Sequence, residues 1–251
     1  ESVDQTSNTT ESAWMAALSS DFALTFQSNF TSIAAGYMPV QSAQNGWYLW
    51  RSIGWLAAIR LALVGVSRDL AAVSDGALVP IANGSAAVAS FLPANKFVHD
   101  ERITPGLDAD KFLTIRSFNP NTANGVGYYI NNPRVMSSAT SDYKYIQYVR
   151  IANEAARLSQ SFWQMQLSAD VLLDRSTGRI LDSVALQLER GSNQSMQELE
   201  NNQDVSALQT VVSRTDDIIN TETLTVTIKL VPKGYVKDIP ISITFTKSIG
   251  G

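Results

Sequence analysis

The chain has 251 residues, of which 45% are hydrophobic and 17% are charged, and its net charge is −4. A chain of this length can bury a large core, as one large domain or two ordinary ones, without disulfides or metals. The 23 acidic residues outnumber the 19 Lys and Arg, and no basic run exists, so nucleic acid is not an expected partner.

The absence of cysteine excludes disulfides and thiolate metal sites, and it is typical of proteins that mature in a reducing compartment. Residues 1–14 lack the basic region and apolar core of a signal peptide. We expect residues 1–10, rich in Ser, Thr and Asn, to be a flexible lead-in or a truncated end. The longest apolar run, residues 53–66, contains Arg60 and is shorter than the roughly 20 residues that cross a bilayer, so no membrane insertion is expected.

The first third of the chain predicts a helix, a strand and a second helix. Thr10 caps a predicted helix over residues 11–27, whose apolar face is formed by Trp14, Leu18, Phe22 and Phe26. Residues 32–40 predict a buried strand ended by Pro39, and Asn45-Gly46 predicts a turn. The following helix is expected to bury a stripe formed by Trp55, Ile59, Ala62, Leu63 and Val66, with Arg60 at its edge. Residues 65–95 read as loops around a short helix.

The middle of the chain joins a hairpin to a long helix. Residues 112–118 and 126–131 favour two strands, and the turn-rich connector between them predicts that they pair. Ser141 or Asp142 is the expected cap of the next helix. Its apolar positions near helical spacing are Tyr145, Val149, Ala152, Ala156 and Trp163.

The last third predicts a helix followed by three strands. A tight turn at residues 174–178 precedes a helix over 180–201, which Gly191 should weaken, and then a strand over 205–214. Residues 224–230 and 239–245 each alternate apolar and polar side chains, so we expect them to form an antiparallel pair. Pro240 favours an edge position for the last strand, where another subunit can pair with it.

These elements predict a mixed α/β (α+β) fold. We expect a wound sheet with flanking helices, followed by a C-terminal unit of a helix plus antiparallel strands. After the lead-in of residues 1–10, the predicted division is an α/β portion over residues 11–135 and a C-terminal domain over residues 136–251.

The densest cluster of chemically active side chains is His99, Asp100 and Glu101 with Asp108 and Asp110. A hydrolase-type site in this loop is one hypothesis. Neighbouring residues on a strand point to opposite faces and the chain has a single histidine, so a metal site is not expected. The alternative is a solvated loop whose charges order a turn or pair across an interface. No G-x-S-x-G elbow or phosphate-binding glycine loop is present, and Asp216-Asp217 is typical of a turn. We expect no cofactor and no enzymatic activity.

A second hypothesis starts from Trp47, Tyr48 and Trp50. Three aromatic rings within four positions are compatible with a carbohydrate-binding or surface-binding module. Aromatic residues also dominate cores and subunit contacts, so packing is the simpler explanation of this cluster.

Four segments, taken in order, resemble the contractile tail sheath proteins of bacteriophages and related injection systems. They are RSIGWLAAIRLALVGVSRDLAAVSDGAL (51–78), HDERITPGLDADKFLTIRSF (99–118), GYYINNPRVMSSATSDYKYIQYVRIANEAARL (127–158) and VSRTDDIINTETLTVTIKLVPKGYVKDIPISITF (212–245). None is a catalytic signature, and it is their common order that carries the resemblance. The N-terminal arm expected of such a protein has no strand pattern in residues 1–10.

The resemblance implies a structural subunit of the virion tail, assembled in the host bacterial cytoplasm. Its implied partners are copies of itself in a helical homo-oligomer, the tail tube protein, and baseplate and tail terminator proteins. Terminal arms would add strands to sheets of neighbouring subunits and keep them connected during contraction. The residues expected at the subunit interface are Ile239, Ile241, Ile243, Phe245, Leu224 and Val226.

Overall fold

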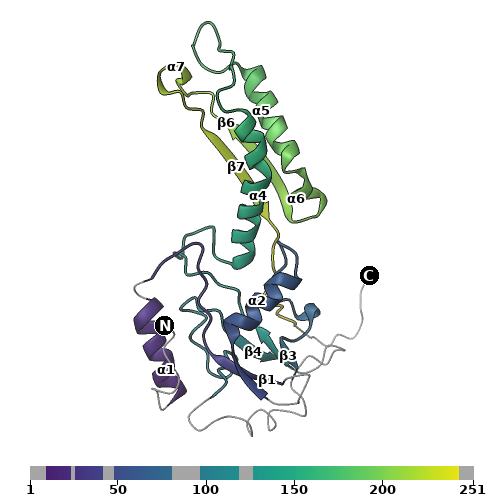
Figure 1. The fold of residues 1–251 in the computed structure, drawn as a ribbon. Coiled ribbons are helices and arrows are strands. Elements are labelled where there is room, and N and C mark those ends of the chain that lie inside the picture. Colours follow the sequence, from purple (N-terminus) through teal and green to yellow (C-terminus); the bar gives the residue numbers. More distant parts are fainter. Residues whose placement is uncertain (1–9, 24–25, 42–47, 81–96, 119–126, 243–251) are drawn as a thin grey trace.

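The computed structural model describes residues 10–23, 26–41, 48–80, 97–118 and 127–242. Figure 1 shows an elongated molecule with two portions. The N-terminal portion holds α1, α2 and strands β1 to β5, and the second portion, here called the helical unit, holds α4 to α7 with β6 and β7. The predicted mixed α and β class is confirmed, and the described strands form small antiparallel sheets.

The N-terminal portion alternates short helices and strands. In chain order its elements are α1 (Glu11–Leu18), η2 (Ser19–Ala23), β1 (Tyr37–Gln41), β2 (Tyr48–Ser52), α2 (Ile53–Leu63), η3 (Val73–Asp75), β3 (Val79–Pro80), β4 (Ile115–Phe118) and β5 (Gly127–Ile130). The helical unit contains α4 (Ile146–Met165), α5 (Asp182–Ser195), α6 (Gln197–Asn201), β6 (Val205–Val212), α7 (Ile218–Thr221) and β7 (Val226–Pro232).

Helix α1 begins as predicted but is shorter than residues 11–27. The Thr10 side chain accepts a hydrogen bond from the Ala13 N–H at 3.2 Å, which caps the first turn. After Leu18 the chain continues as the π-helical turn η2, where Ser20 donates to the Ala17 carbonyl. Such side-chain bonds compete with helix formation, so two serines and an aspartate in succession end α1 early. Of the predicted face, Trp14 and Leu18 are buried, whereas Phe26 is exposed.

The predicted strand over residues 32–40 is also displaced. Strand β1 begins at Tyr37 and pairs with β2, while Ala34 forms an isolated parallel bridge with Leu113. Pro39 lies inside β1 and does not end it. A two-stranded sheet consists of edge strands, in which a missing N–H can face away from the partner. The predicted turn at residues 45–46 lies outside the described residues.

Helix α2 buries a different face from the one predicted. Ile53, Leu56 and Ala57 enter the core. Trp55, Ile59 and Leu63 instead lie on the outside, with exposed fractions of 49%, 41% and 80%. The helix is apolar around most of its circumference, so its periodicity does not single out one buried face. Arg60 lies on this helix and donates to the carbonyls of Asp75 and Gly76 at 2.7 and 2.5 Å, which fastens the following loop.

The predicted hairpin of residues 112–118 and 126–131 is confirmed. Strands β4 and β5 pair antiparallel with Ile115 opposite Ile130, and β3 adds to the other edge of β5. Ile115 and Ile130 are completely buried and pack in one cluster with Ile53 and Met38. This cluster joins the small sheet to α2 and forms the core of the N-terminal portion.

The long helix α4 begins later than its predicted cap. Tyr145 is the N-cap residue, and Ser141 instead accepts from the Tyr143 N–H within the preceding loop. Of the predicted apolar face Val149 is buried, and the other buried positions of α4 are Gln147, Ile151, Ala155 and Ser159. The Ser141 hydroxyl is thus already used within the loop of residues 141–144 and does not cap α4.

The predicted helix over residues 180–201 is two helices, α5 and α6, which meet at Met196. Gly191 lies in α5 against α4, and a Cβ atom there would approach the ring of Phe162 to 2.5 Å. The glycine therefore permits close packing of α4 and α5.

The predicted turn at residues 174–178 is confirmed. The Asp174 carboxylate accepts from the Ser176 hydroxyl and from the backbone N–H groups of Ser176 and Thr177, which lowers the pKa of Asp174 to about 2.

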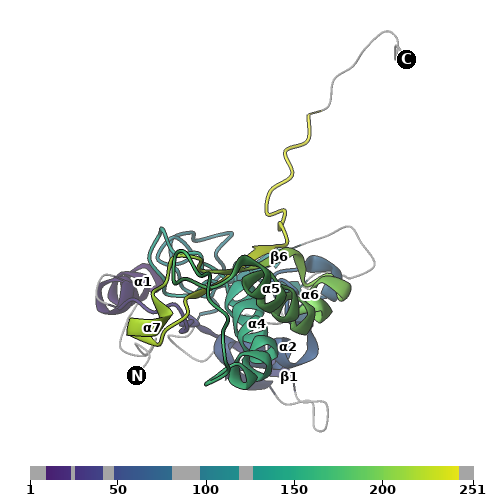
Figure 2. The ribbon, with the colours of Figure 1, turned by 90° about the horizontal axis from the view of Figure 1, so that it is seen from above.

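The predicted pairing of residues 224–230 with 239–245 is wrong for the part that the structure describes. Strand β7 pairs with β6, and Leu230 lies opposite Leu208. Residues 233–242 contain no strand or helix, and residues 243–251 lie outside the described residues. In Figure 2 the yellow C-terminal segment leaves the body of the molecule and extends away from it.

The two faces of the N-terminal helices generate the first prediction. Trp14 is 1% exposed and packs edge-on against Phe97, whereas Trp55 is 49% exposed and has Arg51 at 5.2 Å from its ring. We expect Trp14→Ala to lower the free energy of unfolding by about 3 to 5 kcal/mol, as for other buried aromatic residues. Trp55→Ala, the matched control, should cost about 1 kcal/mol or less. Urea unfolding of both variants measures this, and equal losses would contradict the burial described here.

Candidate assembly interface

The C-terminal segment, residues 233–242, is anchored at its start to the N-terminal portion. The Tyr235 hydroxyl donates to the Ser67 carbonyl at 2.5 Å, and Lys233 donates to the Ser67 hydroxyl at 3.1 Å. Lys237 forms an ion pair with Asp69. Three side chains at alternate positions therefore bind one short loop, and this places the chain that follows β7 against residues 67–69.

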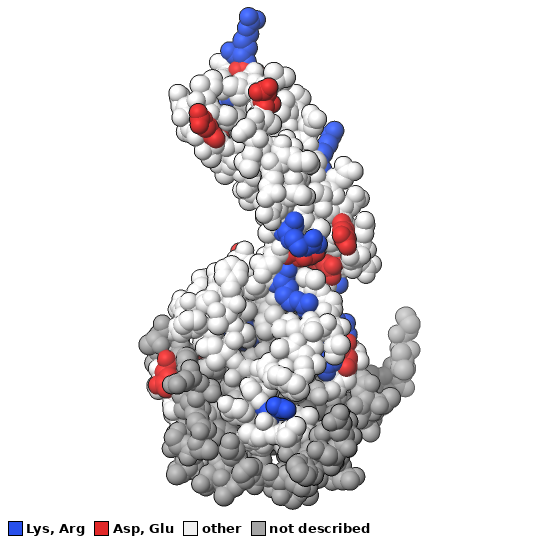
Figure 3. Space-filling view, viewed as in Figure 1, with Lys and Arg blue, Asp and Glu red and all other residues white. Residues whose placement is uncertain are grey.

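Aromatic contacts strengthen this anchor. The ring of Tyr235 lies 5.9 Å from that of Tyr148, and the Lys237 ammonium lies 5.5 Å from the centre of the Tyr145 ring. Burial and the charges nearby raise the pKa of Tyr235 to about 12, so its hydroxyl is protonated and can donate at neutral pH. On the face shown in Figure 3, basic and acidic side chains gather together where the two portions meet.

Beyond Lys237 the segment exposes apolar side chains. Ile239 and Ile241 have exposed fractions of 74% and 79%. They are two of the residues that the sequence predicts at a subunit interface, and Ile243 and Phe245 lie outside the described residues. Leu224 and Val226 are half-buried beside Val212 in the helical unit. Exposed Ile residues on an extended segment are unfavourable in water, and burial in a partner would remove that cost.

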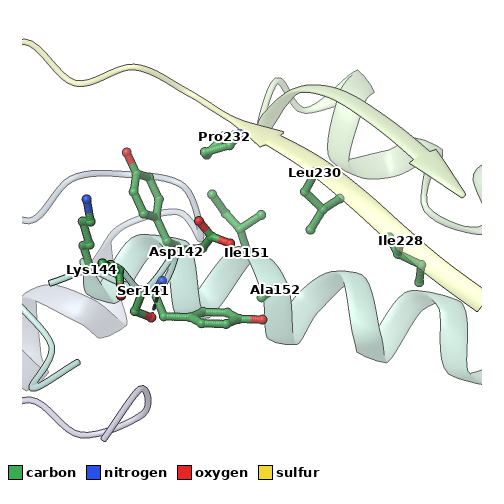
Figure 4. A pocket seen from close by; sticks show the side chains of 11 residues that line it. Ser141, Asp142, Lys144, Ile151, Ala152, Ile228, Leu230 and Pro232 are labelled. Atoms are coloured by element: carbon green, nitrogen blue, oxygen red, sulfur yellow. Dashed lines mark hydrogen bonds between the residues drawn. The ribbon is translucent and has the colours of Figure 1, made fainter. Parts of the chain in front are cut away.

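A groove of about 470 Å³ runs between α4, the loop before it and β7. Figure 4 shows Ile151 and Ala152 on α4, and Ile228, Leu230 and Pro232 on β7, around this space. Polar residues of the loop, Ser141, Asp142 and Lys144, lie at one end of it. The groove therefore has an apolar wall along β7.

His99 lies in the core and not in the solvated loop that the sequence predicted. Its side chain is inaccessible, with Nδ1 at 2.8 Å from Glu11 Oε1 and Nε2 at 2.9 Å from Glu101 Oε2. Burial alone would lower the pKa of His99, but its hydrogen bonds to Glu101 and Glu11 and the charges of both carboxylates outweigh burial and raise the pKa. The His99 side chain thus joins α1 to the loop that contains residues 99–101.

The other acidic residues of this loop also serve the local structure. Asp100 accepts from the N–H groups of Arg102 and Ser117 at 3.0 Å. Asp108 accepts from Asn132 at 2.9 Å, and Asp110 accepts from the Ser19 hydroxyl. Among the described residues, no group of three or more His, Cys, Asp or Glu is arranged to hold a metal ion. The cluster is brought together by folding, but each carboxylate is occupied by a structural hydrogen bond.

The other two candidate clusters are also placed in the fold. Trp50 is half-buried and stacks on Tyr37 at 6.5 Å between ring centres, and Trp47 lies outside the described residues. Asp217 caps α7 by accepting from the Asn220 N–H at 3.3 Å, as its predicted turn position implies.

In the parts of the chain that the structure covers, no helix is long and apolar enough to cross a membrane.

The sequence reading missed the anchor residues Ser67, Asp69, Tyr235 and Lys237. Their signal is the alternation of Lys233, Tyr235 and Lys237, which places three polar tips on one side of an extended chain. Ser67 and Asp69 show the same spacing of two.

Comparison with known proteins finds one family model and two solved chains that are similar to this chain. Residues 142–250 match the family model described as DUF2586, C-terminal domain. A chain of the sheath complex of an extracellular contractile injection system, PVC, in its contracted state, matches with a TM-score of 0.56 and 12% identity, over 94% of this chain and 60% of that one. A chain of the anti-feeding prophage (AFP) baseplate matches with a TM-score of 0.54 and 13% identity, over 97% of this chain and 66% of that one.

This chain therefore spans about 60 to 66% of the length of those solved chains and shares their fold. No curated protein matches the sequence.

The buried His99 generates a prediction about pH. Because folding raises the pKa of His99, its contribution to stability is complete below its ordinary pKa of 6.5 and is lost as the pH rises through the higher folded value. The pKa of Glu101 is lowered, since its bonds to His99 and to the Gly106 and Asp108 N–H groups outweigh burial. Its contribution is therefore present above the ordinary value of 4.5 and is lost as the pH falls.

We expect the free energy of unfolding to be highest between about pH 4.5 and 6.5 as far as this pair is concerned, and to decline above that window. Urea unfolding between pH 5 and pH 9 (roughly the range in which a histidine with a raised pKa titrates) measures the decline. His99→Gln keeps a polar side chain that does not titrate, so its profile should lack this decline. An unchanged slope in that variant would show that other groups cause it.

The anchor generates a third prediction. We expect Tyr235→Phe, which removes the donor to the Ser67 carbonyl, to increase the rate of limited tryptic cleavage after Lys233 and Lys237, because both lysines are held in the same anchor. Val236→Ala is the control, because Val236 is 77% exposed and lies between the anchor residues. Equal cleavage in wild type and Tyr235→Phe would mean that this hydrogen bond does not hold the segment.

Proposed function

We propose that this chain is a structural subunit of a contractile tail sheath, and that it assembles with copies of itself into helical rings around a tail tube. The observation that carries the proposal is the anchored C-terminal segment, which leaves the fold with exposed Ile239 and Ile241 on an extended chain. A segment of this kind is suited to pairing with another subunit through backbone hydrogen bonds and alternate apolar side chains.

Assembly by pairing of the segment with another subunit requires no covalent or catalytic step. The segment of one subunit and the sheet of the next are different surfaces, so the contact is heterologous and generates a ring or a helix. The proposed contact residues are Ile239, Ile241, Ile243, Phe245, Leu224 and Val226. The anchor at Ser67 and Asp69 fixes the direction in which the segment leaves, so every subunit presents it in the same way.

The similarity to solved contractile injection systems supports this proposal. One similar chain belongs to a sheath complex in the contracted state, and the other to a baseplate. By analogy, the tail tube, baseplate and tail terminator proteins are the proposed further partners, and the virion tail is the proposed location, with assembly in the host cytoplasm. Residues 11–135 would then form the α/β portion of the subunit, and residues 136–251 the portion that carries the contacts.

The two alternative functions have less support. A hydrolase that uses the loop of residues 99–110 would need an accessible base, but His99 is inaccessible and held by Glu11 and Glu101. A carbohydrate-binding surface would need exposed stacked rings, and Trp50 is half-buried against Tyr37. The positions of His99 and Trp50 are explained by packing.

We expect the full chain, purified and concentrated, to form rings or tubes in negative-stain electron microscopy. Ile239→Ser with Ile241→Ser should abolish these assemblies and leave a folded monomer, because the segment loses its apolar side chains. Val236→Ser is the matched control, since Val236 is equally exposed but belongs to the anchored part, and it should still assemble. A wild-type chain that stays monomeric at high concentration would refute the proposal.

A further inference from the structure

The face of helix α2 that points away from the core is apolar throughout. Trp55, Ile59 and Leu63 follow one another at spacings of four, so they lie on one side of the helix, and their exposed fractions are 49%, 41% and 80%. A helix face that stays in water usually carries charged or polar side chains, so this face is suited to burial by a partner. The exposed positions of the helix are Trp55, Ala58, Ile59, Ala62 and Leu63.

The shape and the border of this face also suit a protein contact. Ala58 and Ala62 form a low row beside the row of larger side chains, and such a groove can receive side chains of a partner. Arg51 is exposed and lies 5.2 Å from the ring of Trp55. Trp and Arg are among the residues that most often carry the binding energy of an interface.

A second exposed apolar surface lies at the far end of the helical unit. This distal end consists of residues 165–186 and 213–224, and Figure 1 shows it at the end remote from the N-terminal portion. Half-buried residues from both ranges pack in one cluster around Ala185 and Val212. On the outside, Leu172 and Ile219 have exposed fractions of 70% and 66%.

The loop that carries Leu172 is fixed by its own hydrogen bonds. The Leu172 carbonyl accepts from the Leu181 N–H at 3.0 Å, and the Asp174 N–H donates to the Arg179 carbonyl at 2.7 Å. The Asp174 carboxylate closes the turn between these bonds. An apolar side chain held on such a loop loses little conformational entropy when it binds, so the distal end is organised for contact before a partner arrives.

The two apolar surfaces carry opposite charges. Residues 48–64 contain Arg51 and Arg60 and no acidic residue. The distal end contains six acidic residues and three arginines, so its formal charge is −3, and Asp170 and Glu222 are exposed there. Complementary charges favour docking of α2 on the distal end, whereas docking of α2 on α2 of another copy would bring like charges together.

On the basis of the proposed function, we infer that the exposed face of α2 binds the distal end of the helical unit of a second copy. The two surfaces belong to different portions of an elongated molecule, so they do not meet within one subunit (Figure 1). Because they are different surfaces, the contact is heterologous and extends a row of subunits instead of closing a pair. It is separate from the contact proposed for Ile239 and Ile241.

Leu63 and Ile103 give a matched test of the α2 face. Their exposed fractions are 80% and 75%, but Ile103 lies in the loop after His99 and not on α2. We expect Leu63→Ser to raise the protein concentration needed for assembly in sedimentation by roughly tenfold, and Ile103→Ser to assemble as wild type does. Both positions are exposed, so urea unfolding should show little change in stability for either variant.

The distal end is tested by Leu172→Ser, which should weaken assembly as Leu63→Ser does. If the two side chains belong to one contact, their effects are coupled and not additive. The variant that carries both substitutions should therefore assemble about as well as the weaker single variant. Additive losses would mean that Leu63 and Leu172 serve separate contacts, and would contradict the inference.

Crosslinking identifies the occupant directly. The chain has no cysteine, so introduced thiols are the only ones present. Chains with Leu63→Cys are mixed with chains that carry Leu172→Cys under oxidising conditions, and we expect crosslinked dimers of the two. Ile103→Cys mixed with Leu172→Cys is the control and should give few dimers, since a disulfide forms only where two Cβ atoms approach to about 4 Å.

The outcomes separate this inference from the proposed function. Wild-type chains that form no rings or tubes would refute the proposed function, whereas a crosslink between Leu63→Cys and Leu172→Cys would still support the contact. If wild type assembles and both serine variants assemble equally well, the inference is wrong and the proposed function stands. Loss of assembly in Leu63→Ser without the crosslink would assign the α2 face to another occupant, and would also overturn the inference.

Discussion

The path of the chain after β7 depends on one anchor, in which Tyr235 and Lys237 bind Ser67 and Asp69. These contacts join the end of the helical unit to the N-terminal portion, and they turn the following residues away from the sheet that they have just left. Without them, the alternating pattern of residues 239–245 would favour a local hairpin, because nearby strands pair at a small entropic cost. The anchor prevents residues 239–245 from pairing with β7 of the same subunit. The apolar side chains of Ile239 and Ile241 therefore stay exposed and can contact another molecule.

The sequence predicts a structural feature well when the residues that determine it lie close together in the chain. The β4–β5 hairpin, the cap at Thr10 and the turn at Asp174 follow from residues close in the chain, and all are confirmed. The buried face of α2 does not, because a helix that is apolar on several faces is oriented only by what packs against it. The prediction that residues 224–230 pair with residues 239–245 was wrong for a related reason. Alternation identifies a segment that suits a sheet, but it does not specify which strand the segment joins.

The candidate site shows the same limit for charged residues. His99 and its acidic neighbours look like a solvated cluster when read along the chain, because their partners Glu11, Ser19 and Asn132 are distant in sequence. Folding buries His99 and gives it two carboxylates, an arrangement that stabilises the ionised form despite burial. A conspicuous group of titratable residues in this chain is therefore structural support for α1. The anchor residues Ser67, Asp69, Tyr235 and Lys237 are instead ordinary in type, and the sequence did not predict their role.

Backbone hydrogen bonding connects the fold to its proposed assembly. A two-stranded sheet has two outer edges whose N–H groups need acceptors, from water, side chains or another strand. On β6 the acceptors are side chains of α5 and α6, and they are fixed when the helical unit folds. On β7 the described residues supply a groove with an apolar wall and no strand. The N–H groups on the β6 edge are therefore satisfied within the subunit, whereas the exposed Ile239 and Ile241 would be buried only by a partner, as the proposed function requires.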